Sequence, residues 1–426
     1  MLKHMNALDL ARYHSDKMEM IMEIDIHPRE MELKGTKELT LTLMGPRRAG
    51  KSYQLYNILK AREGKDCLYI NFEDIEMEGT TYKDLYGLVG LYEETFGHRP
   101  KVLLFDEVQK VVGWEKAINQ LYESKRYEIY LSGSSSRMLA KEIATALRGR
   151  GTKHVMLPLS FREFLDFKEW KTQTRYSTSQ ENQIKNLLMR YLERGGFPLI
   201  ACDERSFAKF FEEYVDLVIY RDMVERHGIK NIFILKYLIR SLMSSCSKEF
   251  SINKVHNTLR SQGIKTSNRL LYEYFSFLED AFFVFGLRKY SHSLKHTELS
   301  IPKIYLADTG IVTYSNGFEV GKAMENTVFL ELLRRKYAEP PLDIFYWKDN
   351  SGECDFVLRK NGKTLSLIQV SYISKGPVSE KEVQGLLRCA SELRCDDLLL
   401  ITWDIEGVIN GTIKMIPLWK WLMNKS

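Results

Sequence analysis

The sequence lacks the features that would place it in a membrane, in a secreted class or around a structural metal. No apolar run reaches the roughly eighteen residues of a membrane-spanning helix, so we expect no membrane partner. Residues 1–6 lack the apolar core and small-residue cleavage site of a secretory signal. The 6 cysteines are scattered, without C-x-x-C pairs or histidines at metal-binding spacing. We therefore expect a cytoplasmic protein with reduced cysteines.

Charge and composition exclude little beyond this. The net charge of +6 over 426 residues permits contact with nucleic acid without requiring it. The hydrophobic content of 44% and the charged content of 28% are typical of a globular protein. We find no internal repeat and no low-complexity tract. A chain of this length predicts about two or three domains.

One octet carries a phosphate-binding motif. Residues 45–52 read Gly-Pro-Arg-Arg-Ala-Gly-Lys-Ser, which fits the G-x-x-x-x-G-K-[ST] phosphate-binding loop, or P-loop. Leu39–Met44 alternates as a strand does, and Tyr53–Arg62 predicts a helix. A strand that enters a glycine-rich turn and then a helix is the context that such a loop needs. The sequence therefore predicts an ATP site.

The motif predicts a role for individual residues of this loop. Lys51 would reach the β- and γ-phosphates, and Ser52 would ligate Mg²⁺ through its hydroxyl. Arg47 and Arg48 can also be solvated side chains without a ligand role. The residues expected to bind the nucleotide are Gly45, Pro46, Arg47, Arg48, Ala49, Gly50, Lys51, Ser52 and Tyr53.

A second segment completes this expected site. Lys101–Glu107 places apolar residues in a row before Asp-Glu, which predicts a strand buried on both faces of a parallel sheet. Asp106 would emerge at the carboxyl end, where α/β sheets bind ligands, and would hold Mg²⁺ directly or through water. Glu107 would orient and activate the attacking water. Without the P-loop upstream, a solvated Asp-Glu pair would be the simpler interpretation.

The first 168 residues predict an α/β fold. Further strands are expected over Asp66–Asn71, Glu128–Leu131 and Val155–Leu159, with a helix over Trp114–Glu123. Strands that alternate with helices predict a doubly wound parallel sheet. We assign residues 1–168 to this P-loop NTPase core, and the polar stretch 171–183 to a boundary.

The second domain, residues 185–315, is expected to be helical and to end in a winged helix. Phe250–Leu259 and Ser267–Glu279 predict helices separated by a tight turn. Phe282–Tyr290 and Lys303–Leu306 predict two strands. Helix, turn, helix and hairpin is the order of a winged helix.

Residues 320–426 predict a small separate α/β module. Helices are expected over Ala323–Lys336 and Glu380–Leu393. Asn361 and Gly362 predict a hairpin turn. The expected strands are Asp343–Trp347, Cys354–Arg359, Leu365–Val370 and Leu398–Thr402.

Several short motifs together resemble those of AAA+-type ATPases found mostly in archaea and bacteria. In that family an ATPase domain precedes a winged helix and a nuclease-like C-terminal domain of uncharacterised function. The resemblance covers nearly the whole chain and implies an ATP hydrolase with a degenerate restriction-endonuclease-like third domain. It is carried by residues 45–52, Phe105-Asp106-Glu107, Leu131–Ser135, Gly149-Arg150, Pro158-Leu159-Ser160-Phe161-Arg162-Glu163-Phe164, Tyr305-Leu306-Ala307-Asp308-Thr309-Gly310 and Glu353-Cys354-Asp355-Phe356-Val357.

The resemblance implies two more catalytic residues. Ser132, or alternatively Ser134, would be the polar sensor that reads the γ-phosphate and the attacking water. Arg150 would stabilise the charge that spreads over the γ-phosphoryl oxygens, with Arg148 as the competing candidate. Because this arginine can come from a neighbouring subunit, a homo-oligomer is among the expected partners.

Basic residues on the expected winged helix suit double-stranded DNA. Lys265 and Arg269 open the expected recognition helix, and Arg288 and Lys289 lie on the expected wing. Such residues contact phosphates and base edges. The alternative is a winged helix used for packing or for oligomer contact.

The third domain carries part of a nuclease pattern. Glu325, Asp355 and Gln369 fall where a PD-(D/E)xK-type nuclease would place its metal ligands. In such a site two acids bind Mg²⁺ and a lysine helps to activate water. Here Gln369 stands in place of a glutamate and Ser371 in place of the lysine. Gln369 can still offer a carbonyl oxygen, but Ser371 cannot replace an ammonium, so we favour a degenerate fold that binds nucleic acid or protein.

Three functions follow from these patterns. The favoured one is Mg²⁺-dependent ATP hydrolysis that switches the orientation of the winged-helix and C-terminal domains and so governs DNA binding. The second is a nucleotide-gated DNA-binding scaffold or regulator with little turnover, against which Glu107 argues. The third is an ATP-controlled, metal-dependent nuclease, against which Ser371 argues.

Overall fold

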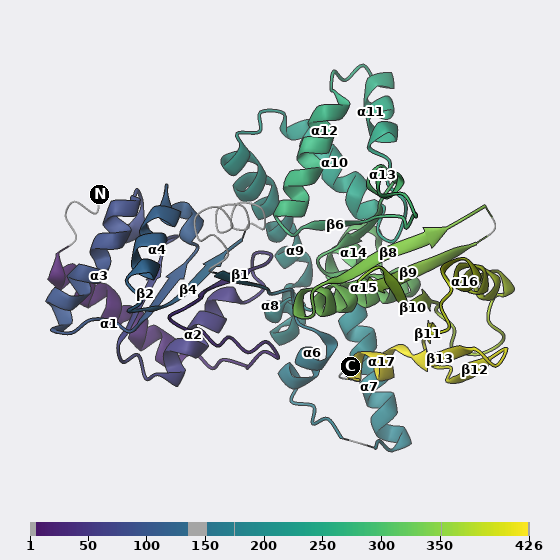
Figure 1. Cartoon of the computed structure of the whole chain (residues 1–426), viewed down its shortest axis with the longest axis horizontal. Coiled ribbons are helices and arrows are strands. Elements are labelled where there is room, and N and C mark those ends of the chain that lie inside the picture. Colours follow the sequence, from purple (N-terminus) through teal and green to yellow (C-terminus); the bar gives the residue numbers. More distant parts are fainter. Residues whose placement is uncertain (1–5, 135–150, 174, 351, 425–426) are drawn as a thin grey trace. The chain divides into compact units, whose positions relative to one another are not determined.

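The computed structural model describes residues 6–134, 151–173, 175–350 and 352–424 (Figure 1). The chain folds into two compact units, Met1–Met156 and Leu157–Ser426. Within the described ranges, we find no helix that combines the length and the apolar character needed to cross a membrane.

The first unit is built on a sheet of parallel strands in the order β2-β3-β4-β1-β5. All residues of β1 and β3 are buried, as expected for strands covered on both faces. The doubly wound α/β core predicted from the sequence is therefore confirmed. Its elements are α1 (Ala7–Glu23), β1 (Thr40–Met44), α2 (Lys51–Ala61), β2 (Cys67–Asn71), α3 (Tyr82–Phe96), β3 (Val102–Asp106), α4 (Trp114–Glu123), β4 (Glu128–Gly133) and β5 (Gly151–Val155).

One apolar cluster joins α1 and α2 to the sheet. Ile21 of α1 and Leu55 and Leu59 of α2 pack with Tyr69 of β2 and Leu104 of β3. Leu55 and Leu59 are four positions apart and so lie on one face of the helix. Burying each of these side chains contributes about 1.5–3 kcal/mol, which fixes α2 and β3 in the positions that the nucleotide site needs.

The last strand of this sheet ends earlier than the sequence predicts. β5 pairs with β1 from Thr40 opposite Gly151 to Met44 opposite Val155. The expected strand Val155–Leu159 is wrong, because the chain leaves the sheet after Met156, whose N–H donates to the Met44 carbonyl at 2.7 Å.

The segment that follows is held inside the second unit. Pro158 has no N–H and so cannot donate a hydrogen bond to a neighbouring strand. Nη2 of Arg334 donates to the Pro158 carbonyl at 2.7 Å and to the Leu159 carbonyl at 3.2 Å. Leu159 also bonds Gly196 through its N–H (2.7 Å) and the Tyr191 hydroxyl through its carbonyl (2.7 Å). Four bonds thus hold two consecutive residues.

The second unit begins with helices and contains one large apolar core. That core gathers aromatic and aliphatic side chains from α8 to α14, among them Phe197, Phe211, Tyr214, Leu238 and Phe283. The chain from Val218 to Glu225 is a π-helix that continues α9. The helices are α6 (Phe161–Phe167), α7 (Thr178–Arg194), α8 (Pro198–Cys202), α9 (Phe207–Leu217), α10 (Ile232–Ser244), α11 (Ile252–Ser261), α12 (Asn268–Asp280), α13 (Leu294–Glu298) and α14 (Thr309–Asn316).

The predicted order of helix, turn, helix and hairpin is present. After α11 and α12, strands β6 (Val284–Leu287) and β7 (Lys303–Leu306) form an antiparallel pair. The expected strand Phe282–Tyr290 is longer than β6. After Leu287 the chain no longer pairs with β7. The Tyr290 N–H donates to the Tyr346 carbonyl at 2.7 Å instead. The first strand of the hairpin thereby continues into contact with β8.

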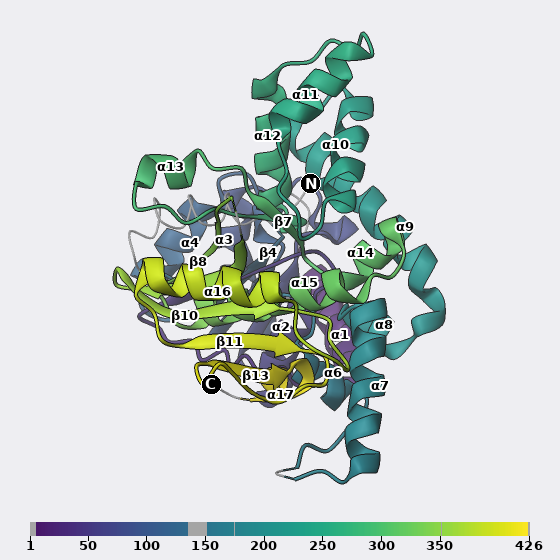
Figure 2. The same cartoon turned by 90° about the vertical axis from the view of Figure 1, so that its right-hand side faces the viewer.

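The C-terminal sheet has the order β12-β13-β11-β10-β9-β8, and Figure 2 shows α16 lying along β10. β8, β9 and β10 pair antiparallel, whereas β10, β11 and β13 pair parallel. The sequence analysis missed β12, β13 and α17. The elements are α15 (Val320–Ala338), β8 (Leu342–Lys348), β9 (Glu353–Lys360), β10 (Lys363–Val370), α16 (Glu380–Leu393), β11 (Leu398–Thr402), β12 (Gly407–Ile409), β13 (Ile413–Pro417) and α17 (Leu418–Met423).

Candidate nucleotide-binding site

The P-loop connects β1 to α2 and depends on its two glycines. Gly50 has φ 99° and caps α2 in the left-handed region, which other residues rarely adopt. A Cβ on Gly45 would lie 2.0 Å from the Met156 carbonyl oxygen, so no larger residue fits there. The helix begins at Lys51, two residues before the predicted start at Tyr53, and the loop therefore leads directly into a helix N-terminus.

The ammonium of Lys51 is held within the loop. Its Nζ donates to the carbonyls of Gly45 at 3.1 Å and Pro46 at 3.0 Å, and the residue is 5% exposed. The carboxylate of Glu107 lies 3.9 Å away. A buried cation beside a helix N-terminus is an arrangement that attracts a phosphate.

Asp106 ends β3 and is fully buried. Burial raises the pKa of its carboxyl, and the charge of Glu107 raises it further, while hydrogen bonds from Ser132, Ser52 and Tyr69 lower it. The hydroxyl of Tyr69 donates to Oδ2 at 3.0 Å, and that of Ser132 contacts Oδ1. The Ser52 and Asp106 side chains predicted as metal ligands are thus brought together.

Glu107 follows Asp106 in an uncommon backbone conformation with φ 51°. Its N–H donates to Oγ of Ser132 at 3.1 Å, so one hydroxyl contacts both acidic residues. The Gln109 amide donates to its Oε2. With 8% exposure, the Glu107 side chain is held at the end of the strand beside the P-loop.

The structure adds residues that the sequence analysis missed. Glu73, after β2, pairs with Arg47 of the P-loop at 3.1 Å, so Arg47 is not simply solvated. Tyr69 lies inside β2 and reaches Asp106 on the neighbouring strand. Tyr53, by contrast, was predicted to bind the nucleotide; it is 49% exposed on the first turn of α2, and its ring lies 5.5 Å from that of Tyr56.

The two candidate sensor serines lie beside the P-loop strand, at the end of β4. Ser132 and Ser134 are both buried at the end of β4, and Ser132 contacts Asp106. Arg148 and Arg150 lie outside the described residues. Their roles stay predictions.

Comparison with known proteins agrees with this geometry. The profile of the AAA domain matches residues 37–165. "Uncharacterized protein MJ1544" of Methanocaldococcus jannaschii is 35% identical over 419 residues, covering 95% of this chain and 93% of the relative. The chain belongs to the family of this archaeal protein. Its residues 37–165 form an AAA-type P-loop NTPase domain with a nucleotide-binding site.

Other similarities extend over most of the chain. An "Uncharacterized protein" of Haemophilus influenzae is 31% identical over 356 residues, covering 81% of this chain and 85% of that protein. Profiles described as domains of unknown function, DUF8612 and DUF4143, match residues 185–320 and 320–421. Among solved structures, the Walker-type ATPase paby2304 of Pyrococcus abyssi is 17% identical with a TM-score of 0.43, covering 74% of this chain and 99% of that chain.

The four residues predicted to contact DNA differ in their hydrogen bonding within the chain. Lys265 and Arg269 are exposed beside the N-terminus of α12. Arg288 is tied to the Ser300 carbonyl at 3.0 Å, and the Lys289 N–H donates to Oγ of Ser300 at 3.0 Å. The first pair is available to a partner, whereas the Arg288 side chain and the Lys289 backbone help to hold the loop before β7.

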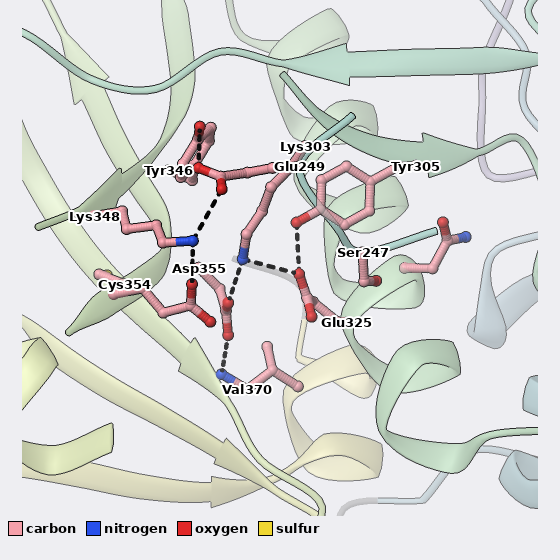
Figure 3. A network of polar contacts seen from close by, with 12 residues as sticks. Ser247, Glu249, Lys303, Tyr305, Glu325, Tyr346, Lys348, Cys354, Asp355 and Val370 are labelled. Carbon is pink, nitrogen blue, oxygen red and sulfur yellow. Dashed lines mark hydrogen bonds and ion pairs between the residues drawn. The ribbon is translucent and has the colours of Figure 1, made fainter. Parts of the chain in front are cut away.

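The nuclease-like residues meet around a lysine that the sequence analysis did not single out. Glu325 of α15 and Asp355 of β9 both lie against Lys303 of β7 (Figure 3). Oε1 of Gln369 accepts the Asp355 N–H at 3.2 Å. Ser371 donates to Glu382 at 3.1 Å. The only signal in the sequence was a lysine at the start of an otherwise apolar strand.

Proposed function

We propose that this protein binds ATP with Mg²⁺ and hydrolyses the γ-phosphate. The observation that carries the proposal is the hydroxyl of Ser132, which contacts the Asp106 carboxylate and accepts the N–H of Glu107 at 3.1 Å. This arrangement fixes a metal-binding acid and a water-activating acid relative to each other. Lys51 lies 3.9 Å from Glu107 and supplies the positive charge on the phosphate side.

The donor atoms fit Mg²⁺. Mg²⁺ prefers oxygen ligands from carboxylates and hydroxyls, and the Ser52 hydroxyl hydrogen-bonds to Asp106. Both residues stand where the P-loop meets the end of β3. When bound, the cation would neutralise charge that develops on the phosphate oxygens.

Glu107 would act as the general base. Its carboxylate would accept a proton from water as the water oxygen attacks the γ-phosphorus and the bond from that phosphorus to the leaving oxygen of ADP breaks. The Gln109 amide and the backbone bond to Ser132 limit the positions that this carboxylate can take. Arg150 would stabilise the γ-phosphoryl charge, within one chain or between two copies of it.

Phosphate release from ATP tests the proposal. Wild-type protein with Mg²⁺ should release phosphate, and Glu107→Gln should lower turnover by about 100-fold or more while nucleotide binding persists. Glu94→Gln, the same substitution at an exposed site on α3, is the matched control and should turn over normally. Tight ATP binding without turnover by the wild type would instead favour a nucleotide-gated scaffold.

We also propose that the second unit contacts duplex DNA through Lys265 and Arg269. Both side chains are exposed at the start of α12, where a helix N-terminus adds to the attraction for phosphate. Replacing both with alanine should weaken DNA binding and lower its salt dependence by about two phosphate contacts. Lys125→Ala/Arg126→Ala, an exposed basic pair in the first unit, is the control. Equal DNA binding by the two double variants would contradict this assignment.

A further inference from the structure

A lysine is buried among acids in the second unit. Nζ of Lys303 lies 2.9 Å from Oδ1 of Asp355 and 3.5 Å from Oε1 of Glu325 (Figure 3). The three side chains are 4%, 3% and 16% exposed. A lysine is almost never buried to this extent unless it is paired.

Other groups of the chain also donate to the acceptor atoms of this site. The Val370 N–H donates to Oδ2 of Asp355 at 3.0 Å. The Tyr305 hydroxyl donates to Oε1 of Glu325 at 2.7 Å. Gln369, the third predicted ligand, uses its Oε1 to accept the Asp355 N–H. Both carboxylate oxygens of Asp355, Oε1 of Glu325 and Oε1 of Gln369 therefore already face the ammonium or an N–H or O–H donor.

The charges of the cluster support the same conclusion. Burial and then the charge of Asp355 raise the pKa of Glu325, Lys303 opposes both, and the net result is a pKa of about 8. Burial also disfavours a charged Lys303, but the neighbouring carboxylates of Asp355 and Glu325 outweigh it and raise the lysine pKa.

We propose that the ammonium of Lys303 replaces a divalent cation in this site. The C-terminal module thereby contains a two-carboxylate site whose counter-ion is part of the chain, and the native protein binds no divalent cation there. Because β7 precedes the module in sequence, the same contact fastens β7 to α15 and β9. Removing the lysine charge leaves two buried carboxylates that need a cation from solution, and a site for Mg²⁺ or Mn²⁺ results.

Binding of Mn²⁺, followed by electron paramagnetic resonance in the absence of nucleotide, tests this inference. All proteins carry Asp106→Asn, which removes the metal ligand proposed for the ATP site. The parent should bind no Mn²⁺. Lys303→Met should gain one site, and a further Asp355→Asn should remove it. Lys348→Met is the matched control, because Lys348 pairs with Glu249 at 2.9 Å but is 39% exposed, and it should gain no site.

Three results would decide against the inference. The first is Mn²⁺ binding by the parent that Asp355→Asn abolishes, since lysine and metal would then coexist. The second is a folded Lys303→Met that binds no Mn²⁺. If Lys303→Met fails to fold, refolding with Mn²⁺ or adding Glu325→Gln should restore it, because either change reduces the uncompensated charge. Failure of both rescues is the third contrary result. None of these outcomes depends on whether ATP is hydrolysed.

Discussion

The hydroxyl of Tyr69 donates a hydrogen bond of 3.0 Å to Oδ2 of Asp106, across the neighbouring strands β2 and β3. Tyr69→Phe leaves the buried carboxylate without one of its donors. We expect the free energy of unfolding to fall by about 1–3 kcal/mol, measured by denaturant titration. Tyr56→Phe on α2 should cost less, because the Tyr56 hydroxyl contacts Tyr69 at 3.5 Å and not Asp106. If both variants lose the same free energy of unfolding, the hydrogen bond to Asp106 contributes no more than the contact between the two tyrosines.

The side-chain amide of Asn326 hydrogen-bonds to the backbone of Leu306 in β7. Its Oδ1 accepts the Leu306 N–H at 2.9 Å, and its Nδ2 donates to the Leu306 carbonyl at 3.1 Å. Asn326→Ala leaves two buried backbone groups unpaired and should destabilise the protein by about 2–4 kcal/mol. Asn253→Ala, at an exposed position of α11, should change stability by less than about 0.5 kcal/mol in the same denaturant titration.

Arg334 holds the start of the second unit and also lies 3.4 Å from Glu331. Arg334→Met leaves the two carbonyls without this donor, while Glu331 keeps Arg162 at 3.6 Å and Arg335 at 3.9 Å, so we expect a loss of about 1–3 kcal/mol. Amide hydrogen exchange should also become faster around Leu159. Lys336→Met on the same helix is the control, because its pair with Asp343 at 3.6 Å is at the surface. Unchanged exchange around Leu159 would contradict the role given to Arg334.

His227 makes stability depend on pH. Its ring stacks on that of Phe277 with centroids 3.6 Å apart, and burial, assisted by Arg226, lowers its pKa from 6.5 to about 4. The unfolded chain therefore binds the proton more readily, and stability falls as pH drops from 6.5 to about 4. His227→Phe keeps the stack and should flatten this part of the curve, measured by denaturant titration at each pH.

Much of the fold could be predicted because local patterns agree with tertiary packing. Lys303–Leu306, Glu380–Leu393 and Leu398–Thr402 have their predicted bounds, since each is an apolar or amphipathic segment between polar ends. β12 and β13 were missed because they are short and carry weak alternation. Val155–Leu159 was wrongly predicted as a strand because its residues are apolar and buried, although they pair with no strand after Val155.

The nucleotide site was predictable for a different reason. Lys51, Ser52 and Asp106 belong to motifs whose spacing follows from phosphate and metal chemistry. Tyr69 and Lys303 could not be found in this way, because each acts on a side chain that is distant in sequence. Only strand register and helix packing place them against Asp106 and Asp355. Pairwise contacts of this kind leave little trace in a single sequence.

The chain passes between the two units through a very short segment. Met156 is bonded to Met44 at the mouth of the P-loop, and Leu159 is bonded to Gly196. The intervening residues, Leu157 and Pro158, allow a separation of roughly 10 Å at most between these anchors. Proline fixes its own φ and restricts the residue before it. Few backbone torsions therefore remain to vary between the hydrogen bond that ends β5 and the one that begins the second unit.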